Sequence, residues 1–425
     1  MATNRSQPNT WRKNLLILWF GTFMAGIGFS EVMPFLSLYV DTMGHFSHDE
    51  LSLYSGLAFA ATYLVTALAS PLWGKLADRT GRKLMLVRAA AGMAIVFFLM
   101  GLAMNVWQLI GLRLLQGVFS GYISNANALI ATQVPKEKSG QALGTLVTGN
   151  VSGTLLGPLV GGILASFFSY RVTFFITGML LLSVFILTFF FVHEDFKPVQ
   201  KQLMLSTRGV IKRLTNSKLV FGMFVTTMII QAANNSIAPI LALYVRQIMN
   251  NSPATTFFSG LVAAVPGIAT LVAAPLLGKL GDRIGTDRII IIGFVLAIVV
   301  YVPMAFVTNV WELIGLRFLI GIANASMLPA VQAILAKNTP YEVTGRIFSW
   351  NQSFQALGNV AGPMIGSVVA SQFDYAGVFI STAILVLLNL ILVYNNTKVM
   401  RRNRTIPLRV DTLNNKSVIS RGCFE

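Results

Sequence analysis

Charged residues, cysteine and histidine are all scarce in this chain of 425 residues. Asp, Glu, Lys and Arg make up 11% of it, whereas a soluble domain carries about 25%. The single cysteine, Cys423, excludes a disulfide framework, and the three histidines form no ligand cluster. A Walker A pattern and a nucleophile–base pair are also absent. We therefore expect no metal, no cofactor and no enzymatic activity.

Apolar residues dominate instead, at 55% of the sequence. They form twelve segments of about 20 residues, the length that spans a bilayer core of ~30 Å. We expect a bundle of twelve membrane helices, an all-α polytopic protein, because lipid satisfies no backbone hydrogen bonds. The first segment is too long for a signal-peptide core, so we expect it to be a span. The predicted spans are 15–40, 53–74, 84–104, 106–130, 141–165, 171–193, 219–245, 257–280, 289–308, 310–335, 346–370 and 374–396.

The net charge of +17 is unevenly distributed along the chain. Lys and Arg gather before the first segment, after the second, in the connector 194–218 and in the tail. The opposite loops hold only Arg171 and Arg246. The positive-inside rule therefore predicts that both termini are cytoplasmic in a multi-pass protein of the cell membrane. Since topology accounts for the positive charge, we expect no nucleic-acid partner.

The chain also contains an internal repeat. Gly74 and Asp78 of the charged turn GKLADRTGRK return 204 residues later as Gly278 and Asp282. The segment VWQLIGLR at 106–113 likewise returns as VWELIGLR at 310–317. Parallel repeats of this kind are typical of transporters with a site between the halves. The predicted parts are an N-terminal six-helix half (1–193), a basic connector (194–218), a C-terminal six-helix half (219–396) and a basic tail (397–425).

These motifs resemble those of the major facilitator superfamily over nearly the whole chain. The turn at 74–83 resembles that family's cytoplasmic signature, and Arg113 matches its helix-4 basic motif. The segment GTLLGPLVGG at 153–162 resembles the helix-5 signature of drug–proton antiporters. The resemblance implies a multidrug efflux protein that exchanges drugs for protons and confers antibiotic resistance, similar to bacterial exporters of tetracycline and fluoroquinolones. We expect it to be a monomer.

The repeated turn is the predicted gate. Contacts of Asp78 with Arg79 and Arg82 are expected to hold the cytoplasmic side closed. The second copy has Thr286 and Asp287 in place of Arg82 and Lys83, so we expect it to contribute less. The predicted gating residues are Gly74, Asp78, Arg79, Gly81, Arg82, Asp282, Arg283, Gly157 and Pro158.

Glycines recur every four residues at 149, 153, 157 and 161, which predicts a groove for close helix packing. We expect the partner to be a helix of the other half, where glycines at 358, 362 and 366 repeat the device.

Glu31 is the acid predicted to lie well within a span, about 24 Å from its inner end. Burial favours the protonated carboxyl group and a nearby cation favours the ionised one, as proton–cation exchange requires. An acid at the outer end of the helix, in water, is the alternative. Asp41 is the next candidate for proton coupling, and the position equivalent to Glu31 in the second half is Ser236.

Arg113 is the third residue assigned to proton coupling. It begins a polar stripe with Gly117, Ser120, Ser124 and Asn127, whose spacing places them on one helix face. Because arginine keeps its charge, we expect it to tune partners rather than carry protons. A side chain that reaches to the membrane interface is the alternative.

Amides and aromatic rings are the other substrate candidates. Amides can donate and accept without net charge, and aromatic faces attract cations; some of the amides could equally form interhelical hydrogen bonds. The predicted substrate-binding residues are Glu31, Phe23, Phe35, Tyr39, Tyr122, Asn127, Gln231, Asn234, Asn235 and Gln355.

The sequence therefore predicts a proton-driven exporter of amphipathic or cationic small molecules. The alternative is a transporter of one metabolite, either a sugar or an organic anion, the latter bound by Arg113 and Arg317. A sensor or scaffold would normally carry a soluble domain, and no connector is long enough for one.

Overall fold

The computed structural model describes residues 10–135, 138–195, 211, 214, 216–340 and 343–397. These residues form helices and no strands. The helices are α1 Thr10–Ser30, α2 Leu36–Asp41, α3 His48–Thr80, α4 Arg82–Gly101, α5 Val106–Val118, α6 Tyr122–Gln133, α7 Ser139–Phe167, α8 Tyr170–Phe191, α10 Ser217–Ser236, α11 Ala238–Ile248, α12 Thr255–Ile284, α13 Thr286–Met304, α14 Val310–Lys337 and α15 Thr344–Asn396.

All twelve predicted segments are found among these helices. Nine stretches of the described residues are long and apolar enough to cross a membrane. Two further segments are each divided into two helices: the first segment into α1 and α2, and the fourth into α5 and α6. The last two run together in α15, whose backbone leaves the helical region at Phe373 and Asp374. The expectation of twelve spans is confirmed.

Local sequence explains several helix boundaries. Ser47 and Glu50 form a reciprocal capping box at the start of α3. Asn105 caps α5 by accepting a hydrogen bond from a backbone N–H of its first turn. The turns that join α3 to α4 and α12 to α13 contain Gly81 and Gly285, with φ of 95° and 108°. Only glycine adopts such angles at little cost, which explains why the last glycine of each copy of the charged turn is Gly81 in the first and Gly285 in the second.

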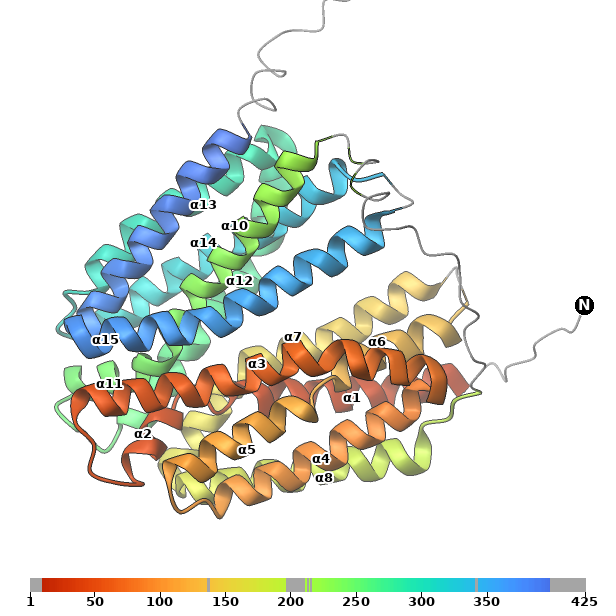
Figure 1. The fold of residues 1–425 in the computed structure, drawn as a ribbon, viewed down its shortest axis with the longest axis horizontal. Helices are drawn as coiled ribbons and strands as arrows, with labels where there is room; N and C mark the ends of the chain where they lie inside the picture. Colours follow the sequence, from red (N-terminus) through yellow and green to blue (C-terminus); the bar gives the residue numbers. More distant parts are fainter. Residues whose placement is uncertain are drawn as a thin grey trace, which may run out of the picture.

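The helices form two sets, α1–α8 (the N-terminal set) and α10–α15 (the C-terminal set). The two sets meet at α2 and α11 and spread apart toward the opposite end (Figure 1). Contacts between the sets run through α3 with α15, α7 with α12, and α11 with both α2 and α3. We call the end that carries Asp41, Arg246 and Asp374 the gate end.

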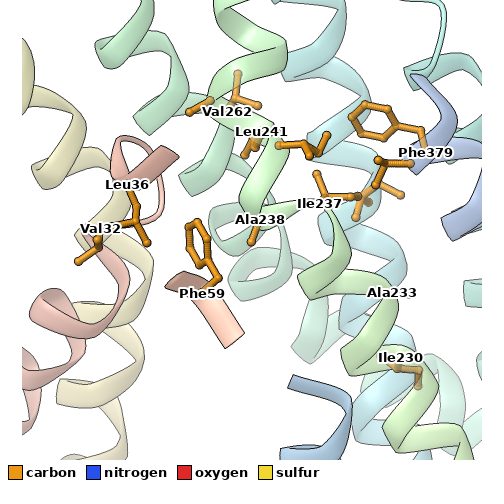
Figure 2. Close-up of a cluster of buried hydrophobic side chains, with 14 of the residues drawn as sticks. Val32, Leu36, Phe59, Ile230, Ala233, Ile237, Ala238, Leu241, Val262 and Phe379 are labelled. Carbon is orange, nitrogen blue, oxygen red and sulfur yellow. The ribbon is translucent and has the colours of Figure 1, made fainter. Parts of the chain in front are cut away.

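The largest hydrophobic core joins the two sets near the gate end. Figure 2 shows part of it, with Leu36 on one side, Phe59 next to it, and Ile237 and Ala238 of the C-terminal set beyond. A second core lies wholly within the N-terminal set. Burial of apolar surface therefore holds the sets together at the gate end.

The predicted partner of the glycine column on α7 is wrong. Added Cβ atoms at Gly153 and Gly157 would meet α1, at the backbone of Phe23 and at Ser30, so the column packs within its own set. The glycines on α15 pack in the same way on α10. Contact of α7 with the C-terminal set comes instead at Gly162, which lies against Gly260 of α12.

Candidate functional site

Glu31 lies in the break between α1 and α2. The break is explained by Pro34, which has no N–H to continue the helical hydrogen bonds. The Glu31 side chain is fully buried. Its Oε1 accepts a hydrogen bond of 2.5 Å from the hydroxyl group of Thr177 on α8. Its Oε2 has no hydrogen-bond partner among the described residues.

This arrangement defines what the carboxyl group can bind. An ionised carboxylate without a cationic partner is costly away from water. A proton on Oε2, or a cation placed beside it, removes that cost. The water-exposed alternative for Glu31 does not describe this structure, since the side chain has no exposed surface.

The C-terminal set holds a neutral copy of this site. Ser236 and Thr382 stand 205 residues after Glu31 and Thr177, and their hydroxyl oxygens lie 2.8 Å apart. Gly161 packs on the Glu31 carbonyl, and Gly366 packs on the Ser236 carbonyl. The backbone frame is thus duplicated, while the titratable group occurs in the first copy.

Arg113 is buried between α5 and α3, with 4% of its surface exposed. Its Nε donates to the carbonyl of Ala58 at 2.9 Å, and its Nη1 donates to the side chain of Gln116 at 2.7 Å. Arg317 repeats the first contact 204 residues later, with Nε 3.2 Å from the Val262 carbonyl. These bonds hold the Arg113 guanidinium inside the N-terminal set, which does not match the alternative of a side chain extended to the interface.

The predicted polar stripe from Arg113 to Asn127 is wrong, because its helix is interrupted. α5 ends at Val118, and α6 begins at Tyr122 after Gly121 at φ 104°. Arg88 donates to the Val118 carbonyl at 3.0 Å and to the Ser120 carbonyl at 2.7 Å. The counterpart in the C-terminal set, α14, is continuous.

The aromatic candidates lie mostly in packed surroundings. Phe35 is fully buried, with its ring stacked 5.8 Å from Tyr170. The Tyr39 hydroxyl donates to the Met100 carbonyl at 2.9 Å. The Tyr122 hydroxyl lies 2.9 Å from that of Thr188. Phe23 is half-buried and stacks on Trp19 with a centroid distance of 5.6 Å, which leaves it more accessible than the other three.

The amide candidates form interhelical hydrogen bonds in part. Asn235 on α10 donates to Asn359 on α15 at 3.1 Å. The Asn234 side chain accepts a 3.4 Å bond from the Tyr301 hydroxyl. Interhelical hydrogen bonding is thus confirmed for Asn234 and Asn235, and substrate binding by the amides remains a prediction. The three other candidates are all half-buried: Asn127, Gln231 and Gln355.

The charged turn is described only in part. The side chains of Asp78 and Asp282 lie outside what the structure describes, so their predicted role stays a prediction. Sequence reasoning missed Glu194. Its two carboxylate oxygens accept from the backbone N–H groups of Arg82 and Lys83 at 2.9 and 2.6 Å. An acid at the N-terminus of α4 is favoured by the helix dipole, and the acid directly after an apolar span was the available signal.

The gate end contains an ion pair between the sets. Arg246 on α11 donates to Asp41 on α2 at 2.5 Å, with side chains 28% and 32% exposed. Beside it, the Ser37 hydroxyl donates to the Pro239 carbonyl at 2.5 Å. Sequence reasoning selected Asp41 for proton coupling and missed its partner. The signal was that Arg246 is one of two bases in the loops opposite the basic ones.

The described part of the chain contains no group of three or more His, Cys, Asp or Glu side chains that could hold a metal ion. The candidate residues are therefore a buried carboxyl group, a buried guanidinium group, three buried rings, the half-buried ring of Phe23 and half-buried amides.

The family profile described as "Major Facilitator Superfamily" matches residues 18–232 and 223–415, and the chain belongs to that family of transporters. Among curated proteins it is similar to "Multidrug resistance protein MdtG" of Salmonella heidelberg, with 52% identity over 397 residues, 93% of this chain and 98% of that protein. The protein of the same name from Salmonella arizonae is 52% identical over 389 residues, 92% and 96% of the two chains.

Two solved structures share the fold at 15% identity. They are a bacterial homolog of the human lysosomal transporter Spinster in inward-facing occupied and unoccupied conformations. Their TM-scores are 0.78 and 0.76, and each comparison covers 95% of this chain and 100% of the other. The expected all-α polytopic fold of the major facilitator superfamily is confirmed.

Proposed function

We propose that this protein is a multidrug efflux transporter that exports amphipathic or cationic small molecules in exchange for protons. Multidrug efflux is supported by the two long matches to relatives named as multidrug resistance proteins. Proton exchange rests on one observation, the fully buried Glu31 carboxyl group with one oxygen unpartnered. A proton and a cationic drug would compete for that oxygen, which is the simplest way to couple their movements.

Transport would proceed by alternating access. Residues 1–193 and 219–396 would act as two halves that rock about the interface between them, joined by the connector 194–218 and followed by the tail 397–425. With both termini cytoplasmic, the gate end would face outward. The cross-set contacts at that end, including the Asp41–Arg246 pair, would then close the outer side. The protein would work as a monomer in the cell membrane.

The single-metabolite alternative receives no support from the buried bases. An organic-anion site would use Arg113 and Arg317, but both guanidinium groups donate to carbonyls within their own set. We therefore retain the exporter as the proposed function.

Efflux from cells tests this proposal. Cells that express the protein should accumulate less of several cationic dyes and antibiotics than cells that express Glu31→Gln, and a protonophore should abolish the difference. Efflux that survives the protonophore would refute proton coupling. If cells with the protein in their membrane accumulate every compound to the same level as cells that lack it, multidrug export is refuted.

Orientation has a separate test. Single cysteines at residues 48 and 205, in a Cys423→Ser background, should label from outside and inside the cell respectively. Residue 205 lies outside the described residues. Labelling of both from one side would contradict the proposed topology.

A further inference from the structure

A second charged contact joins the two sets at the gate end. His48 begins α3, and its Nε2 lies 3.6 Å from the Asp374 carboxylate, with side chains 42% and 58% exposed. The same nitrogen lies 3.2 Å from the Ala370 carbonyl, and the ring lies 4.6 Å from that of Tyr375. The imidazole of His48 is thus held against α15 by three different groups.

This contact and the Asp41–Arg246 pair belong to one cluster. His48, Arg246, Asp374 and Tyr375 line a single cavity of about 490 Å³ between the sets. Tyr375 lies within electrostatic reach of Asp41, Arg246 and Asp374. The cluster therefore draws on α2, α3, α11 and α15, so its charge acts directly on the contact between the sets.

The charge of the cluster depends on His48. Two acids, Asp41 and Asp374, face one permanent base, Arg246, so the cluster carries one excess negative charge while His48 is neutral. Protonation of His48 balances it. On the same helix, Glu50 is engaged by the Ser47 cap, and Asp49 is the other nearby acid. Histidine is the side chain whose charge changes between pH 5 and 8.

Asp374 occupies a special backbone position. It has φ 61°, one of three positive φ values among the described non-glycine residues, and it lies where the two spans of α15 meet. Its carboxylate also accepts from the backbone N–H of Tyr375 at 2.7 Å. With ψ 177°, this is a conformation that side chains other than glycine rarely adopt. An electrostatic attraction on the Asp374 carboxylate therefore acts on the turn that connects the two membrane spans of α15.

We propose that His48 and Asp374 form a pH-sensitive latch, closed when His48 is protonated, that holds the gate end shut. This inference rests on the proposed alternating access. Acid at the gate end strengthens the contact and slows the opening step. A more alkaline solution weakens it and leaves Asp41–Arg246 as the ion pair across this end. Outside acidity would thus drive transport through Glu31 while it restrains the opening through His48.

Distances between spin labels test the latch without transport. Met104→Cys and Phe306→Cys, in a Cys423→Ser background, place labels on the two sets at the gate end, where both side chains are more than 70% exposed. In lipid nanodiscs without a pH gradient or drug, the ratio of closed to open gate end should rise about two- to fivefold from pH 8 to pH 5.5, the range of an exposed ion pair.

Three substitutions separate the latch from other effects. His48→Asn and Asp374→Asn should each remove this pH response, and Asn at residue 374 keeps an oxygen that can accept from the Tyr375 N–H. His48→Lys should keep the gate end closed at both pH values. Asp41→Asn is the matched control, since it should favour the open form at every pH and leave the response to pH in place.

The measurement is repeated in Glu31→Gln, so that titration of Glu31 cannot imitate the latch. A pH response that persists unchanged in His48→Asn and Asp374→Asn refutes the latch, even if export proves to depend on protons. If His48→Asn and Asp374→Asn lose the pH response but the wild-type protein exports no compound, the latch is supported and the proposed function is refuted.

Discussion

Glu31→Gln removes the titratable carboxyl group between α1 and α2 and keeps a side chain of nearly the same shape. Glutamine keeps a side-chain oxygen that can accept the Thr177 hydrogen bond of 2.5 Å. It replaces the unpartnered oxygen with an amide nitrogen that neither gains nor loses a proton near neutral pH. The variant should therefore fold and bind neutral drugs, while it loses exchange of protons for cations.

The size of the effect follows from one carboxyl group exchanging one proton for one cation. Each pH unit across the membrane is worth about 1.4 kcal/mol, or a factor of about ten. A gradient of two units should drive about 100-fold accumulation of a cationic dye by the wild-type protein. Because the Ser236–Thr382 copy contains no acid, Glu31→Gln should show no accumulation above the passive level.

Proteoliposomes with an imposed pH gradient measure this directly. The control is Thr177→Val, which removes the hydrogen bond but keeps the carboxyl group, and should change the rate while dye still accumulates. Undiminished accumulation by Glu31→Gln would show that another group carries the proton, and Asp41 would be tested next.

Three further predictions concern packing and the two ends of the bundle. Gly153→Ala should destabilise the protein by about 1–3 kcal/mol, because its Cβ would meet a carbonyl of α1; in thermal unfolding, Gly144→Ala on the same helix should be neutral, since nothing lies within 4 Å of it. Asp41→Arg should reduce efflux by opposing Arg246, and the double variant Asp41→Arg with Arg246→Asp should recover it; failure of the swap would mean that the pair does not act through its charges. Asp78→Asn should retain drug binding but slow turnover, and complete loss of binding would indicate a structural role.

The positions of the spans were predictable from the sequence, because a membrane helix needs an apolar segment of about 20 residues and such segments are visible in a single sequence. The repeat was also visible, and it correctly identified Ser236 as the residue equivalent to Glu31 in the second half. Equivalent positions share a backbone frame even where their side chains differ, as the paired contacts of Thr177 and Thr382 show.

The errors arose where tertiary contacts decide the outcome. Glycine spacing predicted close packing of α7 but carried no information on which helix would fill the groove. The interruption between α5 and α6 depends on Arg88, which lies on another helix and satisfies the free carbonyls. Asp41 and Arg246 stand 205 residues apart, at equivalent positions of the two repeats, but the sequence did not show that these two positions face each other.

The glycine column of α7 also limits how this transporter can evolve. Its close neighbours on α1 and in the break after it include main-chain atoms, such as the carbonyls of Phe23 and Glu31, which no compensating mutation can remove. A new drug in the environment therefore cannot select variants at these glycines without damage to the fold. If Phe23 and Gln355 bind substrate as predicted, adaptation of the substrate range can use these half-buried positions, whose side chains are less tightly enclosed.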